Sequence, residues 1–247
     1  MTKIYEALEQ AQKESKGVEK QEPVSARSAF IPLAAHFVES DMEKEMIRLY
    51  QNLQSLFSEG EGKILEFLGS REGEGTSTII REFARVMATK FDKWVVLLDA
   101  DRYHPTQHDY FRVEANFSWE DAVRGRGSID KALHRIGEAS LFVSPMSENS
   151  DSAPQIFNAP GMDPILKELK ERFDLVLIDC PPATTFPDGL AICRKVDGVI
   201  LIVEAEKTRW PVIENVKDMI TQAGGKILGV VLNKRHHHIP EFIYKRL

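Results

Sequence analysis

Short, uninterrupted apolar runs constrain the fold of this chain more than any other feature. Val95–Leu98 and Leu175–Ile178 each consist of four consecutive aliphatic residues. A strand with one face in water alternates apolar and polar residues, whereas a strand covered on both faces is apolar throughout. Stretches with helical spacing separate the runs, as in βαβ units. The sequence therefore predicts a doubly wound, mostly parallel α/β sheet with helices on both faces.

The expected elements alternate along most of the chain. The expected strands are Ile64–Gly69, Trp94–Asp99, Leu141–Pro145, Leu175–Asp179, Val199–Val203 and Ile227–Leu232. The expected helices are Met42–Phe57, Ser77–Lys90, Asp163–Arg172 and Trp210–Ala223. Before them, residues 1–14 are predicted to form an amphipathic helix and residues 15–38 a linker punctuated by prolines. Residues 39–247 are then expected to form one domain.

Composition narrows the class of protein. Hydrophobic residues make up 43% and charged residues 28% of the chain, so neither disorder nor membrane burial dominates. A net charge of -6 argues against nucleic-acid binding. No apolar run approaches the roughly 18–20 residues that a membrane-spanning helix requires, so membrane contact would need a partner or a surface. The two cysteines, Cys180 and Cys193, form no disulfide framework and favour the reducing cytosol.

A glycine-rich segment, Gly69–Thr78, lies between the first expected strand of the domain and a helix. Backbone N–H groups at such a helix start cradle phosphate oxygens, so the context is that of a P-loop. The usual pattern ends in Gly-Lys-Ser/Thr. Here Gly75 and Ser77 are in place, but Thr76 occupies the lysine position. The segment predicts a nucleotide site and impaired phosphoryl transfer.

Two later strands are expected to end in acidic residues. Asp99 and Asp101 follow one apolar run, and Asp179 closes another. A carboxylate at the end of a buried strand is costly unless a partner compensates it, and Mg²⁺ with phosphate oxygens is a common compensation. The alternative is that each aspartate caps the turn that follows it. Three acids at strand ends downstream of a glycine loop favour the metal interpretation.

Together these segments resemble the bacterial tyrosine kinases of exopolysaccharide and capsule synthesis (BY-kinases), relatives of the MinD/ParA-type P-loop ATPases. The matching motifs are Gly73-Glu74-Gly75-Thr76-Ser77, Asp99-Ala100-Asp101-Arg102-Tyr103-His104-Pro105 and Asp179-Cys180-Pro181-Pro182. The resemblance runs from about Glu39 to the C-terminus and includes the N-terminal helix. A dinucleotide-binding Rossmann fold is disfavoured because no Gly-x-Gly-x-x-Gly follows a strand.

The resemblance implies ATP or ADP and Mg²⁺ as cofactors and a role for each matching residue. Asp101 and Asp99 would be catalytic, with Asp101 as the base. Ser77, Asp99 and Asp179 would hold the metal directly or through water. The residues expected to bind the nucleotide are Arg71, Gly73, Glu74, Gly75, Thr76, Ser77, Thr78 and Asn233. Arg71 falls where related loops place a second lysine, and it is a candidate for supplying the missing charge.

The chain departs from the family pattern at three places besides Thr76. Tyr103 stands at the arginine of the second motif, and a one-residue shift predicts that the adjacent Arg102 points elsewhere. The segment Glu45-x-x-Arg48-x-x-Gln51 resembles the family's Glu-x-x-Arg-x-x-Arg oligomerisation motif without its last arginine. The C-terminal tail offers a lone phospho-acceptor candidate, Tyr244, in place of a tyrosine cluster.

The expected function is that of a nucleotide-binding, tyrosine-kinase-like regulator of exopolysaccharide or capsule biosynthesis or export, with catalysis weakened or lost. The resemblance implies a membrane-bound chain-length determinant protein as partner. It also implies a cytoplasmic location at the inner face of the membrane through that partner, and a possible homo-oligomer. Two alternatives remain open: an active autophosphorylating tyrosine kinase, and a MinD/ParA-type positioning ATPase.

Overall fold

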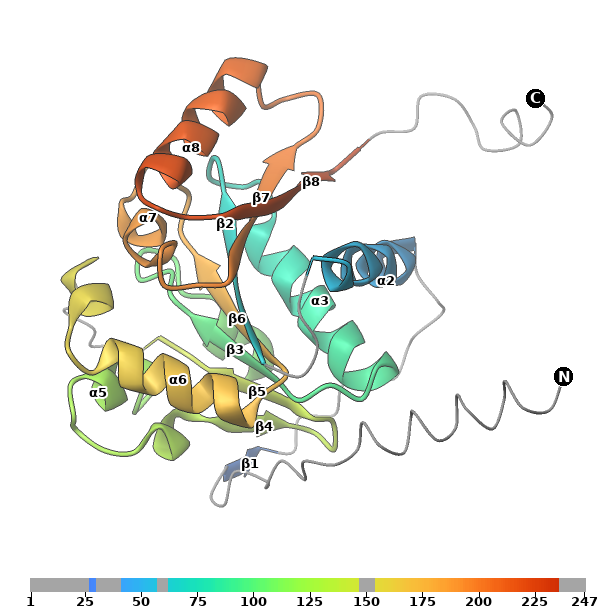
Figure 1. Ribbon diagram of the computed structural model, residues 1–247. Helices are drawn as coiled ribbons and strands as arrows, with labels where there is room; N and C mark the ends of the chain where they lie inside the picture. Colours follow the sequence, from blue (N-terminus) through green and yellow to red (C-terminus); the bar gives the residue numbers. More distant parts are fainter. Residues whose placement is uncertain (1–26, 30–40, 57–61, 147–153, 236–247) are drawn as a thin grey trace, which may run out of the picture.

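One eight-stranded sheet organises the structure, a computed structural model that describes residues 27–29, 41–56, 62–146 and 154–235 (Figure 1). The strand order is β1-β4-β5-β3-β6-β2-β7-β8. The strands are β1 (Arg27–Ala29), β2 (Lys63–Gly69), β3 (Val95–Asp99), β4 (His134–Ile136), β5 (Leu141–Ser144), β6 (Leu175–Cys180), β7 (Gly198–Glu204) and β8 (Ile227–Asn233). All neighbouring pairs are parallel except β4 with β5. The expected doubly wound, mostly parallel fold is confirmed.

Helices cover both faces of this sheet. The α-helices are α2 (Asp41–Gln54), α3 (Thr76–Lys90), α4 (Gln107–Phe111), α5 (Trp119–Val123), α6 (Met162–Arg172), α7 (Asp188–Ile192) and α8 (Trp210–Gln222). Two 3₁₀ turns are η1 (Ile129–Ala132) and η2 (Pro154–Asn158). Helices α2 and α3 pack on one face, and α5 to α8 pack on the other, as Figure 1 shows. No helix in the described part of the chain is long and apolar enough to span a membrane.

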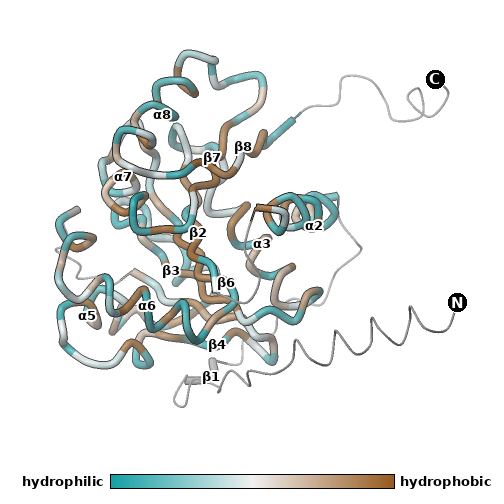
Figure 2. Tube along the Cα trace, viewed as in Figure 1, coloured by the Kyte–Doolittle hydropathy of each residue, from teal (hydrophilic) through white to brown (hydrophobic). Residues whose placement is uncertain are grey.

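The central strand β2 explains why the apolar runs are uninterrupted. Leu65 and Phe67 pack toward α2 and α3, whereas Ile64 and Leu68 pack into the core on the other face. All four are at most 4% exposed. Hydrophobic residues are accordingly concentrated along the strands in Figure 2. Glu66 is the polar exception in this strand, and it is fully buried.

The six expected strands and four expected helices all occur, with ends within three residues of those predicted. The elements that sequence patterns did not predict are short. β1 and β4 have three residues each, and α4, α5 and α7 have five, which is too few for a period to show. β1 lies inside the segment predicted as a linker, residues 15–38. The predicted N-terminal helix and Tyr244 lie outside the described residues.

Ion pairs of one buried glutamate hold helix α2 against α3. The carboxylate of Glu43 pairs with Arg85 at 3.4 Å and with Lys90 at 2.9 Å. On the opposite, exposed side of α2, Glu45 and Arg48 form an ion pair at 2.7 Å. The remaining position of the predicted oligomerisation motif, Gln51, is exposed along with them. The motif therefore lies on the solvent face of the helix.

Candidate nucleotide site

The glycine-rich loop lies at the carboxyl end of β2, where parallel strands of a doubly wound sheet present their ligands. Its turn depends on two glycines, Gly73 (φ 81°) and Gly75 (φ 91°), both in the left-handed region that favours glycine. Gly75 is the residue immediately before α3, so the loop opens directly into a helix of 15 residues. This is the strand–loop–helix arrangement predicted from the sequence.

The loop presents a row of open backbone donors. Within the described residues, no acceptor pairs with the N–H groups of Glu74, Gly75, Thr76 or Ser77. The next amides are different, since Thr78 and Ile79 both donate to the Gly75 carbonyl, at 3.1 and 3.0 Å. Four successive unpaired N–H groups at the positive end of a helix form an anion site.

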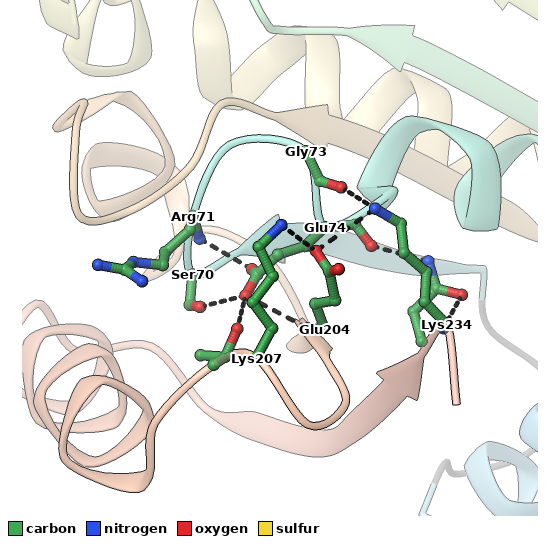
Figure 3. Close-up of polar contacts among 9 residues, drawn as sticks. Ser70, Arg71, Gly73, Glu74, Glu204, Lys207 and Lys234 are labelled. Carbon is green, nitrogen blue, oxygen red and sulfur yellow. Dashed lines mark hydrogen bonds and ion pairs between the residues drawn. The ribbon is translucent and has the colours of Figure 1, made fainter. Parts of the chain in front are cut away.

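The Glu74 side chain supports this loop from inside the protein (Figure 3). It is 2% exposed. One carboxylate oxygen accepts from Ser70 Oγ at 2.7 Å and Thr208 Oγ1 at 2.5 Å, and the other accepts from the Arg71 amide at 2.8 Å. The Glu204 amide adds a longer bond of 3.3 Å. The side chain of Glu74 therefore binds protein groups, and its backbone N–H is what it can offer a nucleotide.

The end of β8 lies against the same loop. Asn233 Nδ2 donates to the Glu74 carbonyl at 2.7 Å, and Asn233 Oδ1 accepts from the Lys234 amide. Both polar side-chain atoms of Asn233, which was predicted to bind the nucleotide, are thus engaged within the protein. Lys234 Nζ donates to the Gly73 carbonyl at 2.6 Å. Sequence patterns gave no signal for Lys234, because it lies 161 residues from its partner in the chain.

Thr76 brings no charge to the position where the lysine of a P-loop stands. Its hydroxyl faces back toward the start of the loop, since a Cβ added to Gly69 would lie 2.7 Å from Thr76 Oγ1. Arg71 is exposed, and Figure 3 shows its guanidinium extending away from Gly73 and Glu74. Its predicted role as a replacement cation therefore requires a different side-chain position.

Asp179 lies beside the loop at the end of β6 and is partly unsatisfied. Gln107 Nε2 donates to its Oδ2 at 2.6 Å, whereas its buried Oδ1 has no hydrogen-bond partner within the described residues. Burial raises the pKa of this carboxyl, although the nearby Ser77 hydroxyl and Gln107 amide favour the charged form. The structure thus brings the predicted metal residues Ser77 and Asp179 together around an open carboxylate oxygen.

Asp99 and Asp101 are occupied mainly by the loop that follows β3. Asp99 accepts from the amides of Asp101, Thr106 and Gln107 at 3.1 to 3.2 Å. Asp101 accepts from the amides of Tyr103 and His104 at 3.1 and 3.0 Å. Burial raises the pKa of both carboxyls, and for Asp99 the adjacent Asp179 adds to this effect. Both aspartates cap turns, as in the alternative considered from sequence.

A cation missed by sequence reasoning lies near these acids. Arg81 is one helical turn after Ser77 on α3, a spacing that could have indicated the contact. Its guanidinium donates to Gln107 Oε1 at 2.9 Å and to Thr106 Oγ1. Burial lowers the pKa of Arg81, while the charges of Asp179 and Asp99 oppose that shift. Arg81 therefore ties the helix of the loop to the segment that surrounds the acids.

The prediction that Arg102 and Tyr103 point to different places is wrong. Arg102 Nε donates to Asp188 at 2.7 Å, and the Tyr103 hydroxyl donates to the same carboxylate at 3.2 Å. The Tyr103 ring also stacks on Phe186, with centroids 3.5 Å apart. The segment after β3 has left the extended conformation at this point, so the alternation of a strand no longer applies.

A pocket of about 400 Å³ opens beside the loop. Its lining residues are Arg71, Glu72, Glu74, Thr184, Thr185, Glu204, Lys207 and Thr208. They come from the loop itself, from the connection that follows β6, and from the end of β7 with the turn after it. Glu204 holds Lys207 at 3.1 Å and Lys234 at 3.4 Å, so two lysines share one carboxylate at the rim of the loop.

The residues present fit a magnesium ion carried by a nucleotide. Within the described residues no three His, Cys, Asp or Glu side chains converge on one metal position. Mg²⁺ in phosphate sites is bound by one or two protein groups, and phosphate oxygens and water fill the remaining positions. The Ser77 hydroxyl and the unpartnered Oδ1 of Asp179 match that smaller requirement.

Comparisons with known proteins agree with this geometry. The ParA family, described as NUBPL iron-transfer P-loop NTPase, matches residues 62–244. The tyrosine-protein kinase CpsD of Streptococcus agalactiae is 26% identical over 187 residues, covering 75% of this chain and 80% of CpsD.

Two solved structures share the fold. The kinase domain of the Escherichia coli tyrosine kinase ETK superposes with a TM-score of 0.77 at 22% identity, covering 88% of this chain and 86% of that domain. The cell division ATPase MinD of Pyrococcus furiosus superposes with a TM-score of 0.58 at 20% identity, covering 75% and 78%. The resemblance to the BY-kinases is thereby confirmed, and the chain belongs to the ParA family of P-loop NTPases.

Proposed function

We propose that this protein binds ATP or ADP with Mg²⁺ and acts as a tyrosine-kinase-like regulator of exopolysaccharide or capsule biosynthesis or export, with weakened catalysis. The observation that carries the proposal is the row of four N–H groups from Glu74 to Ser77 that have no acceptor among the described residues. Such a row stabilises the phosphates of a nucleotide through hydrogen bonds and the helix dipole. Ser77 and Asp179 would hold Mg²⁺, which neutralises charge on the phosphate oxygens when bound.

Thr76 is the reason to expect weakened catalysis. A lysine at this position would place a positive charge where negative charge develops in phosphoryl transfer. A threonine hydroxyl offers a hydrogen bond without that charge. Losing one preorganised stabiliser of this kind costs about 3 kcal/mol or more, which corresponds to at least about a hundredfold in rate. Asp99 and Asp101 remain the candidate catalytic residues, with Asp101 as the base.

The biological setting rests on the BY-kinase resemblance. It favours a membrane-bound chain-length determinant protein as partner, and a position at the cytoplasmic face of the membrane through that partner. The exposed pair of Glu45 and Arg48 supports homo-oligomer formation through α2, although the motif lacks its last arginine at Gln51.

Two alternatives have specific support. An active autophosphorylating kinase is favoured by the retained Ser77, Asp101 and Asp179, with Tyr244 as the phospho-acceptor. A MinD/ParA-type positioning ATPase is favoured by family membership alone. Its structural counterpart superposes less closely, with a TM-score of 0.58 against 0.77 for the kinase domain.

The test is to titrate the purified full chain with MgATP and MgADP by calorimetry, and to follow phosphate incorporation at Tyr244 by mass spectrometry. We expect measurable binding of both nucleotides and little phosphorylation, with Thr76→Lys raising the phosphorylation rate. Absence of nucleotide binding would overturn the proposal. Robust phosphorylation by the unmodified chain that Asp101→Asn abolishes would establish the active-kinase alternative.

A further inference from the structure

Two hydrogen bonds to carbonyl groups of the glycine loop fix the orientation of the N–H groups that face the anion site. Lys234 Nζ donates to the carbonyl of Gly73 at 2.6 Å, and Asn233 Nδ2 donates to the carbonyl of Glu74 at 2.7 Å. These carbonyls belong to successive peptide units. No peptide bond in the described chain is cis, so each carbonyl points opposite to the N–H of the following residue. The two contacts therefore turn the N–H groups of Glu74 and Gly75 toward the anion site.

The contact from Lys234 is charged, which gives it a further effect. An ammonium group on a carbonyl oxygen polarises the peptide unit and strengthens its N–H as a donor. Lys234 also holds a left-handed backbone conformation, with φ at 56°, that a lysine adopts only at a cost. From this backbone position the Lys234 side chain folds back onto the loop, as Figure 3 shows.

The other cations near the loop are placed differently. Arg71 extends away from the loop in Figure 3, and Arg81 is bound to the segment around the acids. Lys207 pairs with Glu204 at 3.1 Å, and among the described residues its ammonium contacts no loop carbonyl. Lys234 shares Glu204 at 3.4 Å. Lys207 and Lys234 therefore share the carboxylate of Glu204 beside the loop.

We propose that Lys234 is the positioning residue that supplies, through the Gly73–Glu74 peptide, the positive charge that Thr76 does not provide at the phosphate site. The proposal rests on the nucleotide site described above, and it adds Lys234 and the peptide unit through which Lys234 acts. Lys234 reaches the phosphates through the backbone of the loop, so it fixes and polarises donors instead of touching the ligand.

The experiment measures binding of MgATP, MgADP and inorganic tripolyphosphate to the full chain at low and high salt. Lys234→Met removes the charge, Lys234→Arg keeps it, and Lys207→Met is the matched control that shares Glu204. Loss of a charge-assisted hydrogen bond predicts that Lys234→Met weakens all three ligands about tenfold. We expect a clearly smaller loss for Lys207→Met, partial recovery in Lys234→Arg, and a weaker salt dependence in Lys234→Met.

The decisive arm is rescue. Adding Thr76→Lys to Lys234→Met returns charge to the loop by the usual route, and we expect it to restore tripolyphosphate binding. A purely structural role for Lys234 predicts no such rescue, and a contact with the base predicts loss of ATP but not of tripolyphosphate; either result would overturn the inference. Equal losses in Lys234→Met and Lys207→Met would overturn it as well. If the unmodified chain binds no nucleotide, the proposed function itself fails, which is a distinct outcome.

Discussion

Glu66 and Glu74 are buried to nearly the same degree, in one strand and the loop that follows it, yet their surroundings are opposite. Glu74 accepts hydrogen bonds from two hydroxyls and two backbone amides. Glu66 has no hydrogen-bond partner for either oxygen within the described residues. Burial raises the pKa of Glu66 to about 8, although the neighbouring Cys180 thiol favours the charged form. A buried carboxyl can thus organise a site or remain as a cost within the core.

Glu66 and Glu74 therefore have different roles in β2 and in the loop that follows it. Around Glu74, fixed donors shape the loop that faces the ligand. Around Glu66, an added Cβ on Gly189 of α7 would lie 2.9 Å from the carboxyl oxygen, so the helix closes directly over it. Polar groups satisfy the hydrogen bonds of Glu74, whereas Glu66 lies in an apolar environment that packs closely around it.

The largest effect is expected when Glu74, the glutamate with satisfied hydrogen bonds, is removed. Glu74→Ala leaves two hydroxyls and two amides without their acceptor, and we expect a loss of about 4 kcal/mol in the free energy of unfolding. Urea denaturation measures this loss, and nucleotide affinity should fall with it because the loop loses its support. A loss below about 1 kcal/mol would show that water replaces the carboxylate, and the contrast would not hold.

The second effect concerns the pH dependence of Glu66. Its folded pKa of about 8 lies above the ordinary 4.5, so the folded state holds the proton more tightly than the unfolded state. The stability from this carboxyl is complete below pH 4.5 and is lost as pH rises to 8, by about 1.4 kcal/mol per pH unit. The slope flattens near each pKa, so relative to Glu66→Gln the unmodified protein should lose about 3 to 4 kcal/mol between pH 5 and pH 8. Parallel stability curves for the two proteins would contradict this.

Asp179 is intermediate, with one oxygen bonded to Gln107 and the other without a hydrogen-bond partner among the described residues. Asp179→Asn should reduce the Mg²⁺-dependent part of nucleotide binding about tenfold, or about 1.4 kcal/mol. The free energy of unfolding should stay the same or rise, because an amide has no charge to desolvate. Calorimetry with and without Mg²⁺, beside urea denaturation, separates the two effects. A variant that loses stability but keeps its Mg²⁺ dependence would place Asp179 with Glu74 as a structural group.

The smallest effect is expected at the surface. Glu45 is paired with Arg48 on the exposed side of α2, and water screens that pair. Glu45→Ala should change the free energy of unfolding by less than about 0.5 kcal/mol. Sedimentation velocity of the same variant tests the proposed oligomer surface, for which we expect weaker self-association. A stability loss above about 1.5 kcal/mol would show that exposure does not separate Glu45 from the buried glutamates.

The fold was predictable because it depends on local patterns. The runs Val95–Leu98 and Leu175–Ile178 became β3 and β6 in the middle of a parallel sheet, and the glycine loop joined β2 to α3 as expected. The gathering of strand-end residues was also predictable, since parallel strands bring their carboxyl ends to one edge. Ser77 and Asp179, two of the residues predicted to hold a metal, lie close together for this reason, and their metal role stays a prediction.

What could not be predicted depends on contacts between distant parts of the chain. Lys234 meets Gly73 across 161 residues, and Thr208 meets Glu74 across 134. Whether a buried acid is satisfied also depends on its neighbours, so nothing in the sequence distinguished Glu66 from Glu74. The convergence of Arg102 and Tyr103 on Asp188 was missed because it requires knowing where the extended backbone ends.

The edge position of β8 has a consequence for dynamics. Of the described strands, β8 pairs only with β7, and it ends the sheet. Edge strands exchange their amide hydrogens through local opening at a lower free energy than strands in the middle of a sheet. Local opening at the end of β8 would release Asn233 and Lys234 from the loop together, because both contacts come from this strand end. We therefore expect the geometry of the candidate phosphate site to have a local stability of its own, which hydrogen exchange in β8 would report.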